Sequence, residues 1–596
     1  MRFRDLLIAV LCAFAVCALG QDGSINQQTL NQAAAVALSV GKPVQFDVSR
    51  PMTEYYVSAE PQSETPVEIP LRRPPLPSAP AGPEQPDEVL QTGYSGYTLS
   101  GGISFDGATY NGFYPPDPNI AVGPSYILEG TNVLFTVYNK SGAFVANINP
   151  WSGFGGPCQT NQGGDIIVQY DRAADRWLVT QLANNGGPTY YFCISVSTTN
   201  SPTGSYYRWA YTFASLADYP KVAVWPTGYF ASFNMFSGGV TFTGPQVCAY
   251  NRTQMLAGNA SPTAICYQLS TSYASLLPSD LDGATAPPAN SPNFYLSDYG
   301  STNSLKLWKF TPNFANPPAS TFTGPTSISV ASFSVPCGTC VPQSGTTTKL
   351  DSLGDRMMYR LAYRNFGTYQ SMVVNRSVSA SGVIGIRWYE IRNPNGTPTV
   401  YQQGTYAPNA VYRWMGSIAM DKTGSIGLGY STSTSSSHPG IAYTGHHNQD
   451  ALGVMAVENT MITGTGSATS NRWGDYTAMR IDPSDDLTFW YVNEYLSSNG
   501  LSWKTRIGSF LVTPPVTCNA NTSCQPPYGG QVIANITLSC SAPSNISVSA
   551  TACGYSCNSS YNQGYASTLS ATATAQGITS IPWSCSFSYC YNGVCH

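Results

Sequence analysis

Charge is scarce in this sequence. Asp, Glu, Lys and Arg make up 10% of its 596 residues, against roughly 25% in ordinary soluble proteins. The net charge is −4 and Lys and Arg form no cluster, so the chain lacks the electrostatic footprint of a protein that binds nucleic acid or an anionic membrane. Histidine is rare too. His446 and His447 are adjacent, so along a strand they point to opposite faces and do not chelate one metal.

Known catalytic and cofactor motifs are also missing. The sequence has no Gly-x-Ser-x-Gly nucleophile elbow. The stretch "GTGSAT" from Gly464 lacks the Lys of a phosphate-binding loop. We therefore expect neither a cofactor nor a metal.

Long apolar runs are confined to the N-terminus. Arg2 and Arg4 precede an apolar run over residues 6–19, which ends in small residues. This pattern is typical of a secretory signal and is too short to span a membrane. We expect residues 1–20 to be removed, the mature chain to begin at Gln21, and the protein to be secreted to an extracellular or cell-wall location.

Cysteine use agrees with export. Of 16 cysteines, Cys12 and Cys17 lie in the signal, which leaves an even number. In an oxidising compartment these are predicted to form disulfides. They are Cys158, Cys193, Cys248, Cys266, Cys337, Cys340, Cys518, Cys524, Cys540, Cys553, Cys557, Cys585, Cys590 and Cys595.

Asn-x-Ser/Thr sequons permit N-glycosylation if the host is eukaryotic. They stand at Asn139, Asn251, Asn259, Asn375, Asn395, Asn521, Asn535, Asn545 and Asn558.

One sequence pattern recurs along the middle of the chain. "RWMGSIAMDKTGSIGLGYS" begins at Arg413 and "RWGDYTAMRIDPSDDLTFWYVNEY" at Arg472. Each is an alternating apolar run, a polar turn and a second alternating run, which indicates a β-hairpin. Further strand candidates follow most hairpins, so four strands recur at a spacing of roughly 50 to 60 residues, the pattern of β-propeller blades.

The repeat predicts an all-β fold, a β-propeller of six or seven blades. Seven units can be counted, but the unit at Ser291 is irregular, and two stacked sandwiches remain the other interpretation. The last unit offers three strands, and "GYTLSGGISFDG" near residue 100 can supply its fourth. The predicted organisation is a signal (1–20), a flexible Pro-rich leader (21–93), the propeller (94–513) and a small disulfide-rich module with eight cysteines (514–596).

Three resemblances accompany these patterns. The turn at Asp421, "DKTGS", is similar to the Asp-box of sialidase-type propellers, although the usual aromatic is absent. The phrases "PPDPNIAVGP", "YDRAADRWLVTQL" and "LDSLGDRMMYRLAYRNFG" resemble a group of secreted bacterial proteins of unassigned function. That resemblance implies export and a propeller-like fold, and brings no activity with it. The C-terminal cysteine pattern loosely resembles eight-cysteine domains of protist wall lectins.

Carboxylates recur just before the first strand of several units. They could converge at the centre of a propeller with arginines, and a candidate binding set follows: Asp117, Asp165, Asp218, Asp355, Arg356, Arg413 and Arg472. Sialidase-like enzymes use arginines there to hold a substrate carboxylate. Asp475, Tyr476 and Glu494 are then the candidate catalytic groups. A residue repeated once per blade is more often architectural, so the favoured alternative is that these side chains join neighbouring blades.

Aromatic residues crowd the cysteine-rich module. Exposed Tyr and Trp rings are platforms on which sugars stack. The candidates are Tyr555, Tyr561, Trp583 and Tyr589. The alternative is that these rings only cover the disulfides.

The sequence thus predicts a secreted, lectin-like wall or matrix protein. Its partners would be polysaccharide or the glycans of glycoproteins, with the C-terminal module as the main carbohydrate-binding part and other matrix proteins as further partners. The alternative is a polysaccharide-degrading enzyme, a hydrolase or lyase, with its site on the central face of the propeller. A purely structural coat protein is the third interpretation.

Overall fold

The fold is known from a computed structural model. It describes residues 35–55, 57, 65–75, 86–95, 97–184 and 188–513, together with the backbone of seven strands between residues 518 and 595. The chain divides into two compact units, Met1–Thr513 and Pro514–His596, called here the large and the small unit. The predicted all-β class is confirmed, since 53% of the structure is strand and 4% is helix.

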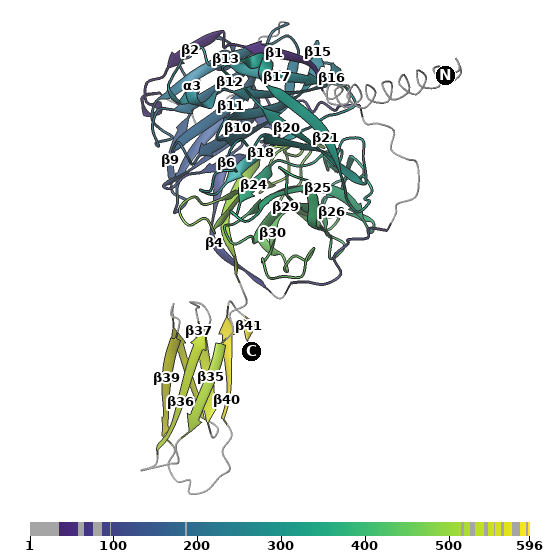
Figure 1. The fold of residues 1–596 in the computed structure, drawn as a ribbon. Helices are drawn as coiled ribbons and strands as arrows, with labels where there is room; N and C mark the ends of the chain where they lie inside the picture. The colour runs from purple at the N-terminus through teal and green to yellow at the C-terminus, as the bar shows by residue number, and fades with distance from the viewer. Residues whose placement is uncertain are drawn as a thin grey trace, which may run out of the picture. The chain divides into compact units, whose positions relative to one another are not determined.

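The large unit contains seven successive groups of four antiparallel strands, here called groups 1 to 7. Groups 4 and 5 share one eight-stranded sheet, because their first strands pair in parallel. Groups 1 to 3 contain the first of the hairpins that the sequence predicted (Figure 1). Group 1 is β6 (Asn119–Val122), β7 (Tyr126–Thr131), β8 (Leu134–Asn139) and β9 (Phe144–Ile148). Group 2 is β10 (Gln162–Asp171), β11 (Arg176–Asn184), β12 (Tyr190–Ser197) and β13 (Tyr206–Phe213). Group 3 is β14 (Leu216–Trp225), β15 (Gly228–Ser237), β16 (Thr241–Tyr250) and β17 (Ala264–Leu269).

Groups 4 to 6 continue the pattern. Group 4 is β18 (Leu277–Asp282), β19 (Asn293–Ser297), β20 (Ser304–Thr311) and β21 (Thr321–Ser329). Group 5 is β24 (Leu361–Asn365), β25 (Gln370–Ala380), β26 (Val383–Arg392) and β27 (Thr399–Tyr406). Group 6 is β28 (Tyr412–Met420), β29 (Ile426–Thr434), β30 (Ser437–His446) and β31 (Asn459–Ile462).

Group 7 joins the two ends of this region. It combines β32 (Ala478–Ile481), β33 (Phe489–Leu496) and β34 (Trp503–Thr513) with β4 (Thr98–Thr109). In β4, Leu99 lies opposite Val512 and Gly101 lies opposite Phe510. The stretch near residue 100 therefore supplies the fourth strand, as its sequence predicted.

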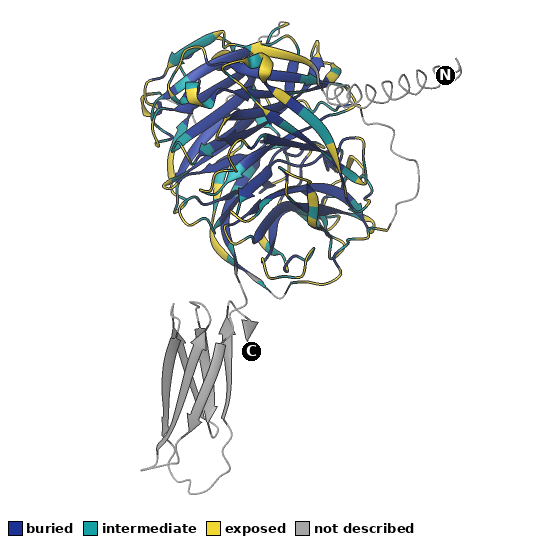
Figure 2. Cartoon of the chain, in the orientation of Figure 1, coloured by how far each residue is buried: buried dark blue, intermediate teal, exposed yellow. Residues whose placement is uncertain are grey.

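The first strands of the groups contact one another in a closed cycle. β6 contacts β10, and the contacts continue through β14, β18, β24, β28 and β32 back to β6. These strands are buried on both faces: β14 is buried along its whole length, as Figure 2 shows for the interior of the large unit. Strands covered on both sides favour continuous apolar runs such as "VAVW" in β14.

Shorter elements connect the groups. β3 (Val67–Glu68) runs parallel to β5 (Phe113–Tyr114), and β22 (Thr339–Val341) pairs with β23 (Leu350–Asp351). The helices in the described part are short: α2 (Gly156–Thr160), α3 (Arg252–Leu256), η1 (Met52–Glu54) and η2 (Pro317–Ala319). None of the helices in the described ranges is long and apolar enough to cross a membrane.

Part of the predicted leader is built into these sheets. β1 (Ala35–Gly41) adds a fifth strand to group 3 by pairing with β17, and β2 (Gln45–Val48) adds one to group 2 by pairing with β13. Arg208, whose side chain is 1% exposed, closes an ion pair with Asp47 at 2.6 Å. The composition of this segment indicated a flexible leader, and the structure differs from that prediction. A segment without apolar periodicity can form a strand here because the outer edge of a sheet offers backbone groups to which it can hydrogen-bond.

Six of the predicted cysteines form three disulfides: Cys158–Cys193, Cys248–Cys266 and Cys337–Cys340. One sequon prediction is contradicted. Asn375 is 0% exposed in β25, so a glycan on its Nδ2 atom does not fit the folded chain. By contrast, Asn259 lies on the surface.

The small unit contains two antiparallel sheets. β35 (Cys518–Cys524), β36 (Gln531–Cys540) and β39 (Ala566–Thr574) form one. β38 (Tyr555–Tyr561), β37 (Ile546–Ala552), β40 (Cys585–Tyr591) and β41 (Val594–Cys595) form the other. The predicted disulfides, sequons and sugar-stacking rings of this unit, Trp583 among them, depend on side chains outside the described residues.

Candidate functional site

The recurring carboxylates stand where each first strand begins. Asp117 and Asp165 both adopt φ near the left-handed region, at 50° and 51°, which Asp tolerates better than most residues. The backbone N–H of Asp475 donates to Asp117 Oδ1 at 2.6 Å. Asn132 then links the first two groups, because its Nδ2 donates to Asp117 Oδ2 and its Oδ1 accepts the N–H of Asp165. The structure therefore brings Asp117, Asp165 and Asp475 together.

Asp165 connects three groups through one oxygen. Its Oδ2 accepts the hydroxyl of Tyr476 and the backbone N–H of Tyr219, both at 3.1 Å. These partners belong to groups 7 and 3, whereas Asp165 belongs to group 2. Such contacts support the architectural interpretation, in which the repeated carboxylates join neighbouring groups.

Two cations lie against the aromatic rings of this cluster. The rings of Tyr219 and Tyr476 stack with centroids 5.3 Å apart. Lys221 Nζ lies 3.1 Å from the centroid of Tyr219 and 4.0 Å from that of Tyr476. The guanidinium of Arg356 lies 4.5 Å from the centroid of Tyr219. Cation–π contact and nearby carboxylates offset the cost of burying these charges.

Burial shifts the protonation of the cluster. Desolvation and the charge of Asp475 raise the pKa of Asp117. Desolvation and the charge of Asp165 raise the pKa of Asp218 to about 7. Desolvation also lowers the pKa of Lys221 well below its usual value. At Asp355 burial is outweighed by Arg356, which holds the pKa of that carboxyl well below its usual range.

The three candidate catalytic groups are engaged by the protein itself. Asp475 Oδ1 pairs with Arg472 Nη1 at 2.9 Å, and the hydroxyl of Tyr476 is held by Asp165. Glu494 Oε1 accepts the backbone N–H of Gly474, and burial raises its pKa to about 8. All three side chains are buried.

The three candidate arginines do not all lie in one cluster. Arg356 forms two hydrogen bonds of 2.9 Å to Asp355, and Arg472 pairs with Asp475. Arg413 pairs instead with Glu458, at 2.6 Å. The structure thus keeps Arg356 and Arg472 with the carboxylates and gives Arg413 a partner in its own group.

A cavity adjoins the cluster. It measures about 190 Å³, and its lining includes Asp165 and Asp218, the ring residues Tyr190 and Tyr191, and Arg72 from the leader. It is large enough for a small polar ligand, and two carboxyl groups face it.

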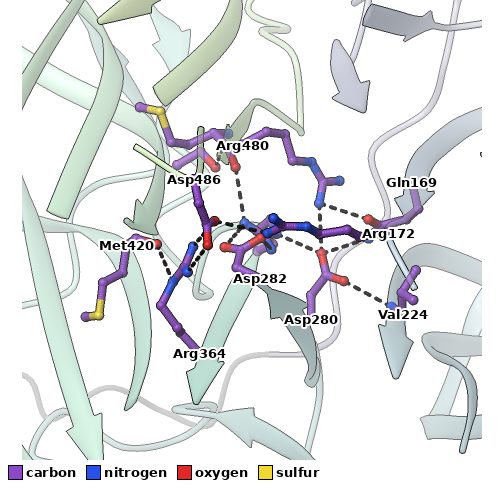
Figure 3. A network of polar contacts seen from close by, with 12 residues as sticks. Gln169, Arg172, Val224, Asp280, Asp282, Arg364, Met420, Arg480 and Asp486 are labelled. Atoms are coloured by element: carbon purple, nitrogen blue, oxygen red, sulfur yellow. Dashed lines mark hydrogen bonds and ion pairs between the residues drawn. The ribbon is translucent and has the colours of Figure 1, made fainter. Parts of the chain in front are cut away.

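A second network, which sequence reasoning missed, lies further along the same strands (Figure 3). Gln169 is four residues after Asp165 in β10, roughly 13 Å along the strand. Arg480 Nη1 contacts both Gln169 Oε1 at 2.9 Å and Asp280 Oδ2 at 2.8 Å. Arg360 Nε also donates to Asp280 Oδ2, at 2.7 Å. Burial would raise the pKa of Asp280, but Arg360 and Arg480 outweigh it and lower the pKa.

An open groove lies between the outer strands of groups 4 and 5. It measures about 560 Å³. Its walls carry neutral hydrogen-bonding side chains and two exposed apolar ones, Tyr401 (42% exposed) and Leu452 (55% exposed). The lining includes Ser327, Ser329, Thr399, Gln402 and Gln403.

Tyr401 is held from one side by a cation. The guanidinium of Arg392 lies 3.3 Å from the Tyr401 centroid and 4.1 Å from that of Tyr369. Arg392 Nε is itself fixed by Glu390 Oε1 at 2.6 Å. The ring therefore has a defined position in the groove while much of it stays exposed.

Comparisons with known proteins give no family. No family model matches the chain, and no curated protein matches it in sequence. Among solved structures, an exo-β-1,3-galactanase from Phanerochaete chrysosporium is similar at 9% identity and a TM-score of 0.28, over 80% of this chain and 93% of that chain. A protein of unknown function from Dyadobacter fermentans is similar at 11% identity and a TM-score of 0.30, over 73% and 100%. Drosophila Semaphorin 1b is similar at 10% identity and a TM-score of 0.32, over 71% and 87%. TM-scores this low carry no argument about this chain.

His446 and His447 each contact a neighbouring group of the protein. Within the described residues, no group of three or more His, Cys, Asp or Glu side chains is arranged to hold a metal ion. His446 is buried and bonds to the carbonyl of Val454 through Nδ1, and His447 stacks on Tyr97 with centroids 4.0 Å apart.

Proposed function

We propose that this is a secreted protein that binds extracellular polysaccharide on a seven-bladed β-propeller. Two observations support seven blades: the first strands of groups 1 to 7 contact one another in a closed cycle, and β4 completes group 7 from the N-terminal side. Closure of this kind removes exposed sheet edges, which are a liability in a β-rich protein.

The groove at Tyr401 carries the proposal of polysaccharide binding. Sugar rings are held by stacking on an aromatic face and by hydrogen bonds to neutral amides and hydroxyls. The groove offers both kinds of group in an open channel of about 560 Å³, so a polymer can lie along it. Three disulfides in the large unit support an oxidising, extracellular setting.

The small unit belongs to the same proposal. Its candidate rings, Tyr555, Tyr561, Trp583 and Tyr589, would provide a second set of stacking platforms, in addition to the groove or in its place. Two sites on one chain would raise the avidity for a repeating polymer without any change in either site.

Binding to insoluble polysaccharides tests the proposal. The secreted full chain is incubated with cellulose, chitin and peptidoglycan, and the protein left in solution is measured. The Tyr401→Ala variant should bind at least one of the polymers that the wild type binds more weakly than the wild type does. The matched control is Tyr94→Ala, which removes another exposed ring (49% exposed) that does not line the groove. Failure of the wild type to bind any polymer rejects the proposal.

A degrading enzyme is the second candidate, and one observation favours it. Asp165 and Asp218 line the same cavity, and the pKa of Asp218 is raised to about 7 by burial and by Asp165. A carboxyl group that titrates near neutral pH suits a general acid. The catalytic pair would then be Asp165 and Asp218, in place of Asp475 and Glu494. Release of reducing ends by the wild type, and its loss in Asp218→Asn, would support this candidate.

A further inference from the structure

The groove at Tyr401 has a cation at each of its two walls. On the group 4 wall, Lys306 of β20 donates from Nζ to Ser327 Oγ at 2.7 Å, and Ser327 lines the groove. On the group 5 wall, Arg392 of β26 lies opposite Thr399, another lining residue, and its guanidinium lies 3.3 Å from the centroid of Tyr401. Both cations are therefore held against side chains that line the groove.

The positive charge at these walls is only partly neutralised. Among the described residues, the ammonium of Lys306 is bonded to a hydroxyl and forms no ion pair with a carboxylate, and no Asp or Glu lines the groove. Glu390 pairs with Arg392, but its side chain is 1% exposed and its second oxygen accepts Gln402 Nε2. The groove thus has an excess of positive charge in a chain whose net charge is −4.

Hydrogen-bond donors at the groove also remain available to a ligand. Arg392 uses Nε for Glu390, and its two Nη atoms, on a side chain that is 24% exposed, have no hydrogen-bond partner among the described residues. Gln403 accepts the N–H of Ala331 with its Oε1, which leaves both hydrogens of its amide nitrogen to donate. Carboxylates and sulfates are strong acceptors for such donors, because a charged partner strengthens a hydrogen bond.

We propose that the groove selects an acidic polysaccharide, one that carries carboxylate or sulfate groups. A sugar ring stacks on Tyr401, and anionic groups of the polymer meet Lys306 on one wall and Arg392 on the other. The inference rests on the proposed polysaccharide binding at this groove and adds the charge of the polymer. Because both cations are partly exposed, each contributes modestly and salt screens the contribution.

Pairs of polymers that differ in charge test this proposal. The secreted full chain is titrated with polygalacturonate and with its fully methyl-esterified form, which has the same backbone and no charge. Dextran sulfate and dextran form the second pair, which separates a sulfate from a carboxylate as the recognised group. At low salt the charged member of at least one pair should bind roughly ten-fold more tightly, and the difference should shrink at about 1 M salt.

A lysine variant locates the effect in the groove. Lys306→Gln removes the charge and keeps a donor for Ser327, so it should weaken binding of the preferred charged polymer about two- to five-fold and leave its uncharged form unaffected. The matched control is Lys422→Gln, an exposed lysine that donates to the carbonyl of Asp485 at 2.8 Å and does not line the groove; it should bind as the wild type does. Tyr401→Ala should weaken both members of the pair, because stacking does not depend on the charge.

The outcomes separate this inference from the proposed function. Equal binding within both pairs, binding to neutral polymers alone, or equal effects of Lys306→Gln and Lys422→Gln overturns the selection of acidic polymers, while polysaccharide binding itself stands. Binding to no polymer of any charge rejects both.

Discussion

Arg480 Nη1 lies 2.8 Å from Asp280 Oδ2, and this ion pair joins group 7 to group 4. The same guanidinium donates from Nε to the carbonyl of Ile120 in group 1 and from Nη2 to the hydroxyl of Tyr359. Its side chain is 7% exposed. One residue therefore satisfies polar groups from sheets on several sides of the ring.

Removing Arg480 should destabilise the whole large unit. In Arg480→Met, Asp280 and Gln169 lose a donor in a buried site, and breaking a buried pair costs about 3–5 kcal/mol. The matched control is Arg506→Met, because Arg506 pairs with Asp106, which is 44% exposed; an exposed pair contributes at most about 1 kcal/mol. Urea unfolding followed by tryptophan fluorescence measures both. Equal losses in the two variants would contradict the role given to Arg480.

A pH dependence of stability should follow from Glu494. Burial raises its pKa to about 8, above the ordinary value of 4.5, so the folded state holds this proton more tightly than the unfolded state. The resulting stabilisation is complete below about pH 4.5 and is lost as pH rises towards about 8, at up to about 1.4 kcal/mol per pH unit. In Glu494→Gln the neutral amide can still accept the N–H of Gly474.

The difference between two pH profiles isolates this effect from other groups. Unfolding free energies of wild type and Glu494→Gln are measured in urea between about pH 5 and 8. The wild type should lose stability relative to the variant as pH rises. Parallel profiles would show that Glu494 is ionised in the folded protein, contrary to the pKa argued from its burial.

The disulfides should contribute differently to the free energy of unfolding, according to the length of chain that each one closes. Cys158 and Cys193 are separated by 35 residues, whereas Cys337 and Cys340 are separated by 3. Loop-closure entropy predicts a loss of roughly 3–4 kcal/mol when the first pair is changed to Ser and roughly 1–2 kcal/mol for the second. Unfolding free energies of the two double-serine variants check the order. A larger loss for Cys337→Ser/Cys340→Ser would contradict the entropic account.

The strand repeat was predictable from the sequence because it is local. Alternating runs around Asp165 or Arg413 need only neighbouring residues to indicate a hairpin. The pairing of residues 98–109 with the last group was predictable as well, since that group lacked a strand.

The contacts between residues of different groups across the ring were harder to predict from the sequence. Gln169, Asp280 and Arg480 are polar residues on three different strands that lie far apart in the sequence, and no spacing rule connects them. Their contact depends on the order in which the groups close. The only local signal was a polar residue in a run otherwise suited to full burial.

The leader was misjudged for a similar reason. Its Pro-rich composition indicates a flexible segment, yet β2 is held by group 2 and Arg73 by Asp351 and Asp355. Two adjacent arginines in a chain with so few charges were the available signal. The burial of Asn375 likewise depends on the packing of β25, which a three-residue sequon does not contain.

The binding isotherm of the full chain on insoluble polysaccharide tests the central claim most directly. The account predicts saturable binding to at least one of cellulose, chitin and peptidoglycan, with Tyr94→Ala equal to wild type. Tyr401→Ala should weaken that binding by about 1–3 kcal/mol, or roughly 5- to 150-fold, as for other aromatic stacking contacts. Absence of binding to every polymer, or an isotherm for Tyr401→Ala that superimposes on the wild type, would contradict it.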